Sequence, residues 1–208
     1  MNTIPLTVNG LTELPHGMIA SIATMLEMKA PPKGFAPMRS PFGYSLERLK
    51  GADVDRYLTL YRDIGGPWLW YSRLILPEDE LRAILDDPRV EAYAMTGGGR
   101  DVGILELDNR VSGETELAFL GLTPKRVGAG FGRYLMSEAI NRAFMRGIRR
   151  LWVHTCTLDH PKAIDFYKAS GFEPYAIGIE IADDPRVTGL LPRDTAPHVP
   201  IIAERVVI

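Results

Sequence analysis

The sequence of 208 residues has little cysteine and no excess of positive charge. Its one cysteine, Cys156, has no second thiol with which to form an intrachain disulfide, and this usage is typical of a reducing compartment. The 24 Lys and Arg residues are outnumbered by 26 Asp and Glu residues, which gives a net charge of −2. Because a nucleic-acid-binding face needs a strong excess of basic residues, we expect no nucleic-acid partner.

Long apolar runs and metal-ligand clusters are also missing. No stretch reaches the roughly 18 consecutive apolar residues of a membrane-spanning helix, and the first residues, MNTIP, lack the basic flank and apolar core of a secretory signal. His154, Cys156 and His160 lie near one another, but a structural zinc site needs four ligands and no second pair is visible. These absences predict a cytoplasmic protein with no membrane partner and no bound metal.

The sequence does contain enough apolar residues, 46% of the total, to bury the core of a domain. Residues 18–28 alternate as in a strand, although a short helix also fits so short a run. Residues 31–43 hold four prolines and two glycines and therefore predict a loop. We expect an N-terminal extension over residues 1–43, made of a strand and a proline-rich loop, and one domain over residues 44–208.

Within the expected domain, short strands alternate with amphipathic helices. Three strands follow one another at hairpin spacing, separated by Gly97–Gly99 and by Ser112–Gly113. The expected strands are 44–49, 89–96, 102–110, 114–123, 151–156, 172–182 and 200–207, and the expected helices are 53–63, 77–86, 131–146 and 161–170. This order, β-α-α-β-β-β-α-β-α-β-β, predicts a mixed α/β domain.

The segment LGLTPKRVGAGFGR, residues 120–133, carries the strongest functional signal. An apolar run ends at a proline, glycines stand at 128, 130 and 132, and an amphipathic helix begins. The free N–H groups and the positive dipole of a helix N-terminus favour an anion, and glycines let a phosphate approach the main chain. The segment therefore predicts a phosphorylated cofactor. A dinucleotide fingerprint would need glycine where Arg133 stands, and no P-loop run is present.

Two sequence blocks resemble the GNAT superfamily of acyl-CoA-dependent N-acetyltransferases. LGLTP (120–124) precedes VGAGFG (127–132), where the family reads Leu-x-Val-x-Pro and then Arg/Gln-Gly-x-Gly-Ile-Gly. HPKAIDFY (160–167), followed by GF (171–172), is similar to the family's Asn-x-x-Ala-x-x-Leu/Phe-Tyr-x4-Gly-Phe. Val127 departs from the usual Arg or Gln, and His160 departs from the usual Asn.

The resemblance implies a mixed, mostly antiparallel sheet flanked by helices. It also implies transfer of an acetyl group from acetyl-CoA to a primary amine of a small molecule or peptide. Two alternatives stay open: a catalytically silent acyl-CoA-binding module, which Val127 and His160 favour, and transfer of a longer acyl group. A homodimer is also compatible with the sequence.

The same resemblance names candidate site residues. It implies that the coenzyme is held by Leu120, Leu122, Val127, Gly128, Ala129, Gly130, Phe131, Gly132, Arg133, His160 and Tyr167. Tyr167 matches the tyrosine that assists the coenzyme sulfur, and Glu116 matches the position of a catalytic glutamate in several members. A base is needed because a lysine-like amine, with a pKa of about 10.4, is mostly protonated at neutral pH. Period-two alternation puts Glu116 on one face with Ala118 and Leu120, and an ordinary edge-strand carboxylate is the other interpretation of Glu116.

An aromatic stretch, PWLWYSR at residues 67–73, follows the first expected helix. Aromatic side chains in this region could line a pocket for the amine acceptor. They could equally pack in the hydrophobic core, and the sequence leaves both interpretations open.

Overall fold

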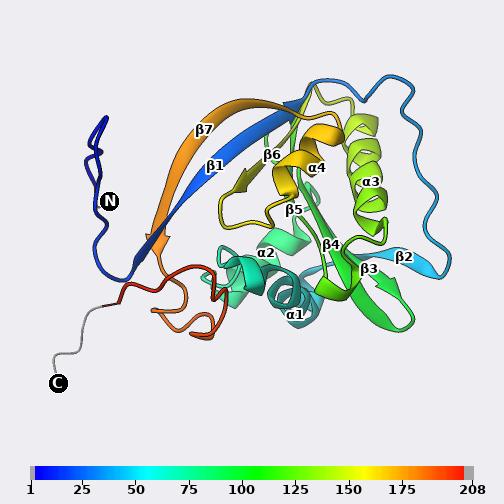
Figure 1. The fold of residues 1–208 in the computed structure, drawn as a ribbon. Coiled ribbons are helices and arrows are strands. Elements are labelled where there is room, and N and C mark those ends of the chain that lie inside the picture. Colours follow the sequence, from blue (N-terminus) through cyan, green and yellow to red (C-terminus); the bar gives the residue numbers. More distant parts are fainter. Residues whose placement is uncertain (1–2, 204–208) are drawn as a thin grey trace.

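The alternating apolar residues of the sequence form the strands of one mixed sheet. The computed structural model describes residues 3–203, and within them seven strands are flanked by helices on both faces (Figure 1). The strands are β1 (Met18–Met28), β2 (Tyr44–Leu49), β3 (Val90–Gly97), β4 (Arg100–Asp108), β5 (Glu114–Leu122), β6 (Arg150–Cys156) and β7 (Glu173–Asp183). The helices are α1 (Val54–Gly65), α2 (Glu78–Asp86), α3 (Phe131–Met145) and α4 (Ala163–Ala169).

The strands lie in the order β2-β3-β4-β5-β6-β1-β7, and β5 and β6 are the parallel neighbours among antiparallel pairs. The predicted mixed, mostly antiparallel sheet is therefore confirmed. The strand interpretation of residues 18–28 is also confirmed, and β1 lies between β6 and β7. The expected N-terminal extension thus contributes a strand to the domain's own sheet. The strand expected near 200–207 is not formed over residues 200–203, and the rest of that range lies outside the described residues.

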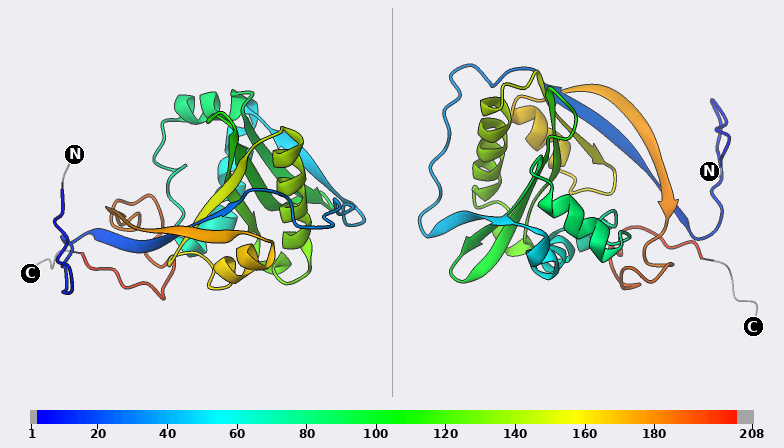
Figure 2. Two further views of the ribbon diagram at one scale, coloured as in Figure 1. Left: turned by 90° about the horizontal axis from the view of Figure 1, so that it is seen from above. Right: turned by 180° about the vertical axis from the view of Figure 1, so that it is seen from behind.

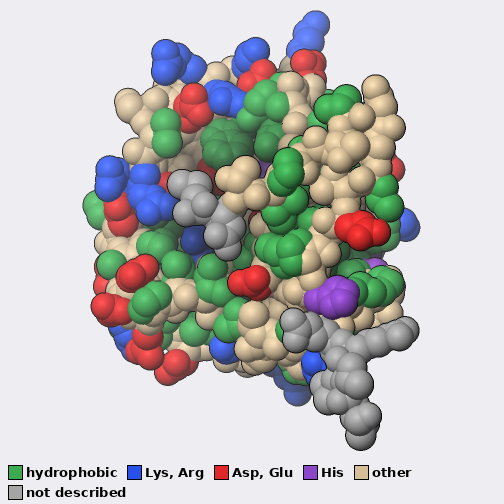
Figure 3. Space-filling model, turned by 90° about the vertical axis from the view of Figure 1, so that its left-hand side faces the viewer, with side chains coloured by type: hydrophobic (Ala, Val, Ile, Leu, Met, Phe, Trp, Pro, Cys, Tyr) green, Lys and Arg blue, Asp and Glu red, His purple; other side chains and the backbone are tan. Residues whose placement is uncertain are grey.

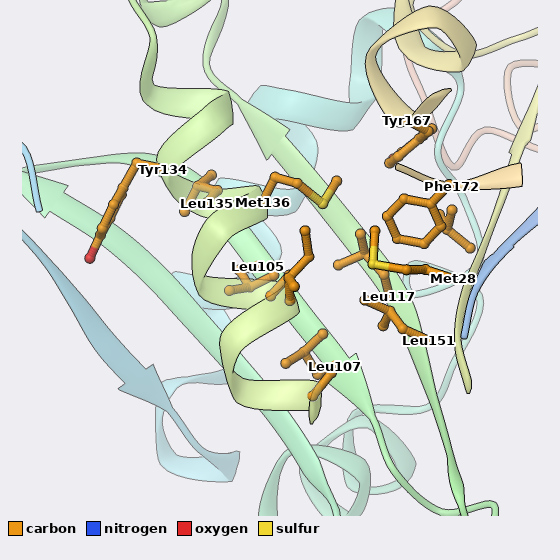
Figure 4. Close-up of a cluster of buried hydrophobic side chains, with 14 of the residues drawn as sticks. Met28, Leu105, Leu107, Leu117, Tyr134, Leu135, Met136, Leu151, Tyr167 and Phe172 are labelled. Atoms are coloured by element: carbon orange, nitrogen blue, oxygen red, sulfur yellow. The ribbon is translucent and has the colours of Figure 1, made fainter. Parts of the chain in front are cut away.

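Period-two alternation divides the side chains of the sheet between two cores. In β3, Ala92 and Ala94 pack under α1 and α2, whereas Tyr93 and Met95 point to the opposite side. Figure 2 shows α1 and α2 together on one side of the sheet, with α3 and α4 on the other. The core on the α3 side brings Met28 of β1 against residues of β4, β5, β6 and α4 (Figure 4).

The proline-rich loop, residues 29–43, runs from the end of β1 along α3 to β2 (Figure 1). The backbone N–H of Met38 donates a hydrogen bond of 2.9 Å to the Ser137 hydroxyl of α3. Phe35 packs against the core on this side. Among residues 3–203, no helix combines the length and the apolar character needed to cross a membrane.

Residues 184–203, which we call the C-terminal segment, fold back from β7 towards the loop between α1 and α2 (Figure 1). Arg186 is almost fully buried; its guanidinium pairs with Asp184 at 2.7 Å and donates to three carbonyl groups between residues 195 and 199. Apolar side chains of the segment pack against Ile19 of β1 and Leu69 of the α1–α2 loop. One buried arginine thus fixes a segment that has no regular secondary structure of its own.

Candidate functional site

The candidate site lies where two parallel strands separate. β5 and β6 pair over Glu114–Glu116 and Arg150–Trp152. Beyond this point, which we call the vertex, β6 curves with β1 and β7 away from the other four strands (Figure 1). A cavity of about 900 Å³ opens between the separated strands. Its walls come from β5, β6, α4, the β1–β7 pair and the α1–α2 loop. Residues 126–133, which lead into α3 and which we call the glycine loop, complete the wall.

A β-bulge in β5 decides which side of the sheet each residue of this wall faces. Leu117 and Phe119 pair with adjacent residues of β4, so Ala118 stands between them without a partner. The bulge reverses the alternation: Leu117 packs in the core under α3, whereas Phe119 packs in the core under α1. The expectation that Glu116 shares a face with Leu120 is therefore wrong. Leu120 packs on the α3 side, and Glu116, next to Leu117, faces the α1 side.

The glycine loop forms one end of the cavity. Gly128 and Gly130 have φ angles of 87° and 85°, in the left-handed region that favours glycine, and Gly130 is the N-cap of α3. Among the described residues, the N–H groups of Gly130, Phe131 and Gly132 have no backbone acceptor. No atom lies within 4 Å of a Cβ built on Gly128, and at Gly130 the nearest is Arg133 Nη2 at 3.7 Å. Free donors at a helix N-terminus, beside open space, fit a phosphate.

Most residues expected to hold the coenzyme line this cavity. These are Leu120, Leu122, Val127, Gly128, Gly130, Gly132, Arg133, His160 and Tyr167. Ala129 and Phe131 are not in its wall. The Phe131 ring packs against Tyr44, with centroids 4.7 Å apart, and Arg126 lies over both rings. Any ligand contact from Phe131 therefore comes from its N–H group, and Arg133 is the arginine of this loop that reaches the cavity.

Tyr167 reaches the cavity from α4. Its ring is 8% exposed and packs edge-on against Phe172, with centroids 5.9 Å apart (Figure 4). Burial, assisted by the negative charge of Asp159, raises the pKa of Tyr167 above its ordinary value. The hydroxyl therefore stays protonated at neutral pH and can donate a hydrogen bond or a proton.

The aromatic residues of the α1–α2 loop form the opposite end of the cavity. Trp68, Trp70 and Tyr71 all line it. The Trp70 Nε1–H donates to Asp159 at 2.9 Å, and the Tyr71 hydroxyl donates to Glu180 of β7 at 2.9 Å. These two hydrogen bonds tie the loop to the β6–α4 connection and to β7.

Buried charge pairs support the same end. Arg73 pairs with the fully buried Glu106 at 2.5 Å, and the Tyr57 hydroxyl donates to the other oxygen of Glu106 at 2.6 Å. Arg110 pairs with Asp108 at 2.5 Å. Both arginines line the cavity, and each already has a carboxylate partner.

Asp159, His154 and Glu180 are among the polar residues of the cavity wall that sequence reasoning missed. Asp159 accepts hydrogen bonds from the Trp70 ring, from a β6 hydroxyl and from a β6 N–H group. His154, interpreted from sequence only as a weak metal candidate, has its Nδ1 3.5 Å from Oε1 of Glu116. Glu180 lies on β7, and β7 reaches the cavity because it pairs with β1. Of these, only Asp159 had a usable signal, since it directly precedes the second family-like block.

Cys156 also lines the cavity. Burial, with the negative charge of Asp159, raises the pKa of its thiol. A protonated thiol is a poor nucleophile, so burial disfavours a nucleophilic role for this cysteine.

On the face that carries the far ends of β1 and β7, acidic, basic and apolar side chains are interspersed (Figure 3). The exposed hydrophobic residues of β7 include Ile177 and Ile179. Charge of one sign does not dominate the described part of this face.

The model of the acetyltransferase (GNAT) family matches residues 57–172, more than half of the chain. No protein in the curated set matches the chain significantly.

Several solved structures share the fold. A GCN5-related N-acetyltransferase from Kribbella flavida is 18% identical with a TM-score of 0.53, over 81% of this chain and 60% of that one. A functionally unknown protein from Staphylococcus epidermidis is 14% identical with a TM-score of 0.59, over 81% and 63%. An aminoglycoside acetyltransferase from a soil metagenome, solved with sisomicin, is 17% identical with a TM-score of 0.52, over 62% and 88%. The chain spans less than two thirds of the first two, and these identities show the fold.

Proposed function

The chain belongs to the acetyltransferase (GNAT) family, and we propose that it transfers the acetyl group of acetyl-CoA to a primary amine. One observation carries the proposal. A single cavity joins the glycine loop at the start of α3 to a carboxylate, Glu116, and a protonated hydroxyl, Tyr167. A phosphate cradle and two proton-handling groups in one space are what acyl transfer from a coenzyme thioester requires.

The coenzyme end is proposed to act through backbone groups. The free N–H groups of Gly130, Phe131 and Gly132 would hold the pyrophosphate, with Arg133 beside them. Leu120 and Leu122 would offer main-chain groups of β5, which is free of β6 beyond the vertex. When bound there, acetyl-CoA would supply the acetyl group as a thioester.

Two side chains are proposed to handle protons. Glu116 supplies a negative charge that draws a proton from the acceptor ammonium, directly or through a neighbouring group. Tyr167, kept protonated by burial, donates to the sulfur that leaves. Trp68, Trp70 and Tyr71 would enclose the acceptor. Since Arg73 and Arg110 are already paired, Glu116 and Glu180 give this end a negative character that suits a small-molecule or peptide amine.

Thermal unfolding with candidate ligands tests the cofactor. Acetyl-CoA at 100 times its Kd should add about 2.7 kcal/mol of stability, which raises Tm by about 5–10 °C for a chain of this size. NAD and ATP should raise it far less, because the glycine spacing fits neither nucleotide fold. Equal stabilisation by ATP would contradict the assignment.

A screen of amines, read by release of the coenzyme thiol, tests the transfer itself. Acetyl-dependent release with at least one amine supports the enzyme. Tight coenzyme binding without release from any amine would instead favour a silent binding module, and faster release from longer acyl thioesters would favour transfer of a longer group.

A further inference from the structure

Glu116 does not face the cavity alone. His154 of β6 lies beside it, with Nδ1 3.5 Å from Oε1 of the carboxylate, just beyond the vertex where β5 and β6 separate. Both side chains line the cavity. The His154 side chain is 47% exposed and that of Glu116 is 25% exposed, so the imidazole is the more accessible of the two groups.

We propose that His154, oriented by Glu116, takes the proton from the ammonium group of the acceptor. This inference rests on the proposed transfer to a primary amine. With Nδ1 directed at the carboxylate, Nε2 is the ring nitrogen left to meet a substrate. An ammonium N–H bond breaks and leaves its electron pair on the amine nitrogen, while an Nε2–H bond forms. The positive charge moves to the imidazolium, which Glu116 stabilises, and the half-exposed ring then releases the proton to solvent.

The surroundings of His154 favour this role. The carboxylate of Glu116 raises the pKa of His154 above its ordinary value against the opposing effect of burial, and the charges of Glu180 and Asp159 act in the same direction. From β6 itself, the Trp152 ring lies 6.4 Å from the imidazole. Of the arginines in the cavity wall, Arg73 and Arg110 are occupied by their own carboxylates, and Arg133 belongs to the glycine loop at the other end.

Matching of proton affinities explains why a histidine is better suited than a carboxylate alone. The pKa of such an amine, about 10.4, is about 6 pH units above the pKa of an ordinary glutamate and about 4 pH units above that of an ordinary histidine. An imidazole whose pKa is raised narrows the difference further. A base is most effective when its pKa lies near the working pH, so Glu116 contributes most by tuning and orienting His154.

The pH dependence of kcat/KM for an accepted amine separates the two roles. The wild-type rate should fall as pH drops through the His154 pKa, because the base becomes protonated. Glu116→Gln lowers that pKa, so the acid limb should move to lower pH. His154→Gln should lose about 10²–10⁴-fold in the plateau and lose the histidine-dependent limb. The double variant should be no slower than His154→Gln alone, and His16→Gln, at an exposed distant histidine, serves as control.

The same pH profiles can also overturn the proposal. If His154→Gln keeps the acid limb and most of the rate while Glu116→Gln loses both, Glu116 itself is the base and the proposal is overturned.

Proton NMR titration gives a readout that needs no turnover. The chain has four histidines, so the resonance missing from His154→Gln assigns this residue. Its pKa should lie above 6.5 in the wild type and fall in Glu116→Gln, with a smaller fall in Glu180→Gln. An unchanged titration in Glu116→Gln overturns the proposal. Failure of acetyl-CoA to stabilise the protein would instead count against the proposed function, and the two results are distinguishable.

Discussion

The two ends of the cavity are built differently. The end proposed for the coenzyme is built mainly from one continuous stretch, residues 120–133, and it offers backbone N–H groups at the start of α3. The end proposed for the acceptor gathers side chains from β1, β5, β6, β7 and the α1–α2 loop. The hydrogen bonds there join residues far apart in the chain, such as Trp70 with Asp159 and Tyr71 with Glu180.

This difference explains how tolerant each end is. A backbone cradle should tolerate valine at position 127, because its donors do not depend on that side chain. The acceptor end depends on individual pairs, and part of its wall lies outside the family match: β1 precedes residue 57, and β7 follows residue 172. Membership of the family therefore constrains the coenzyme end far more than the choice of acceptor.

The largest effect is expected at the backbone end. Gly130→Val should nearly abolish coenzyme binding, because a β-branched residue is strained at a φ of 85° and its side chain enters the space meant for the phosphate. Isothermal titration with acetyl-CoA measures the loss.

Gly43→Val is a matched control for that variant. Gly43 has a φ of 77° with no atom within 4 Å of an added Cβ, and it lies in the loop before β2. It should carry a similar backbone strain and leave coenzyme affinity unchanged. Equal losses of affinity in the two variants would show that Gly130 acts through stability rather than as part of a phosphate cradle.

The same contrast separates the features that the sequence predicted from those that it did not. The glycine loop, α3 and the hairpin strands depend on local signals, and all were predicted. The position of β1 was not, because Ala23 pairs with Cys156 and with Gly178 across more than a hundred residues. The bulge at Ala118 left no trace in the apolar pattern either, and it reversed the face assigned to Leu120 relative to Glu116.

Candidate site residues divide in the same way. Residues that a motif marked, such as Arg133 and Tyr167, do line the cavity, and their roles stay predictions. His154 and Glu180 carry no motif and gain significance only because β5, β6 and β7 bring them to one space. A single sequence contains no record of such pairing, so the residues of the proposed acceptor end could not be predicted from it.

Tyr167→Phe tests the point where the two ends meet. It removes the hydroxyl and keeps the ring and its contact with Phe172. Turnover should fall by about 10²–10⁴-fold with coenzyme affinity little changed, as for a general acid. Tyr134→Phe, at a buried tyrosine of α3 outside the cavity wall, should leave both quantities near the wild type. Unchanged turnover in Tyr167→Phe would mean that the hydroxyl only packs.

The smallest effect is expected from the acceptor-end hydrogen bond between Trp70 and Asp159. Trp70→Phe keeps an aromatic ring between Tyr61 and Phe119 but removes the Nε1–H donor. A hydrogen bond to a charged group contributes about 1.5–3 kcal/mol, so Tm should fall by several degrees for a chain of this size. Because this bond ties the α1–α2 loop to the β6–α4 connection, the KM for the amine should rise while the Kd for acetyl-CoA stays unchanged.

A double-mutant cycle with Asp159→Asn isolates this bond from the packing that is also lost. If the hydrogen bond acts, the two single changes should be non-additive, with a coupling of about 0.5–3 kcal/mol. Additive effects would assign the loss to the smaller ring. An equal loss of amine and coenzyme affinity would contradict the distinction between the two ends, since a change at the acceptor end would then also weaken the phosphate cradle. A loss confined to the amine would show that the two ends of one cavity can be altered separately.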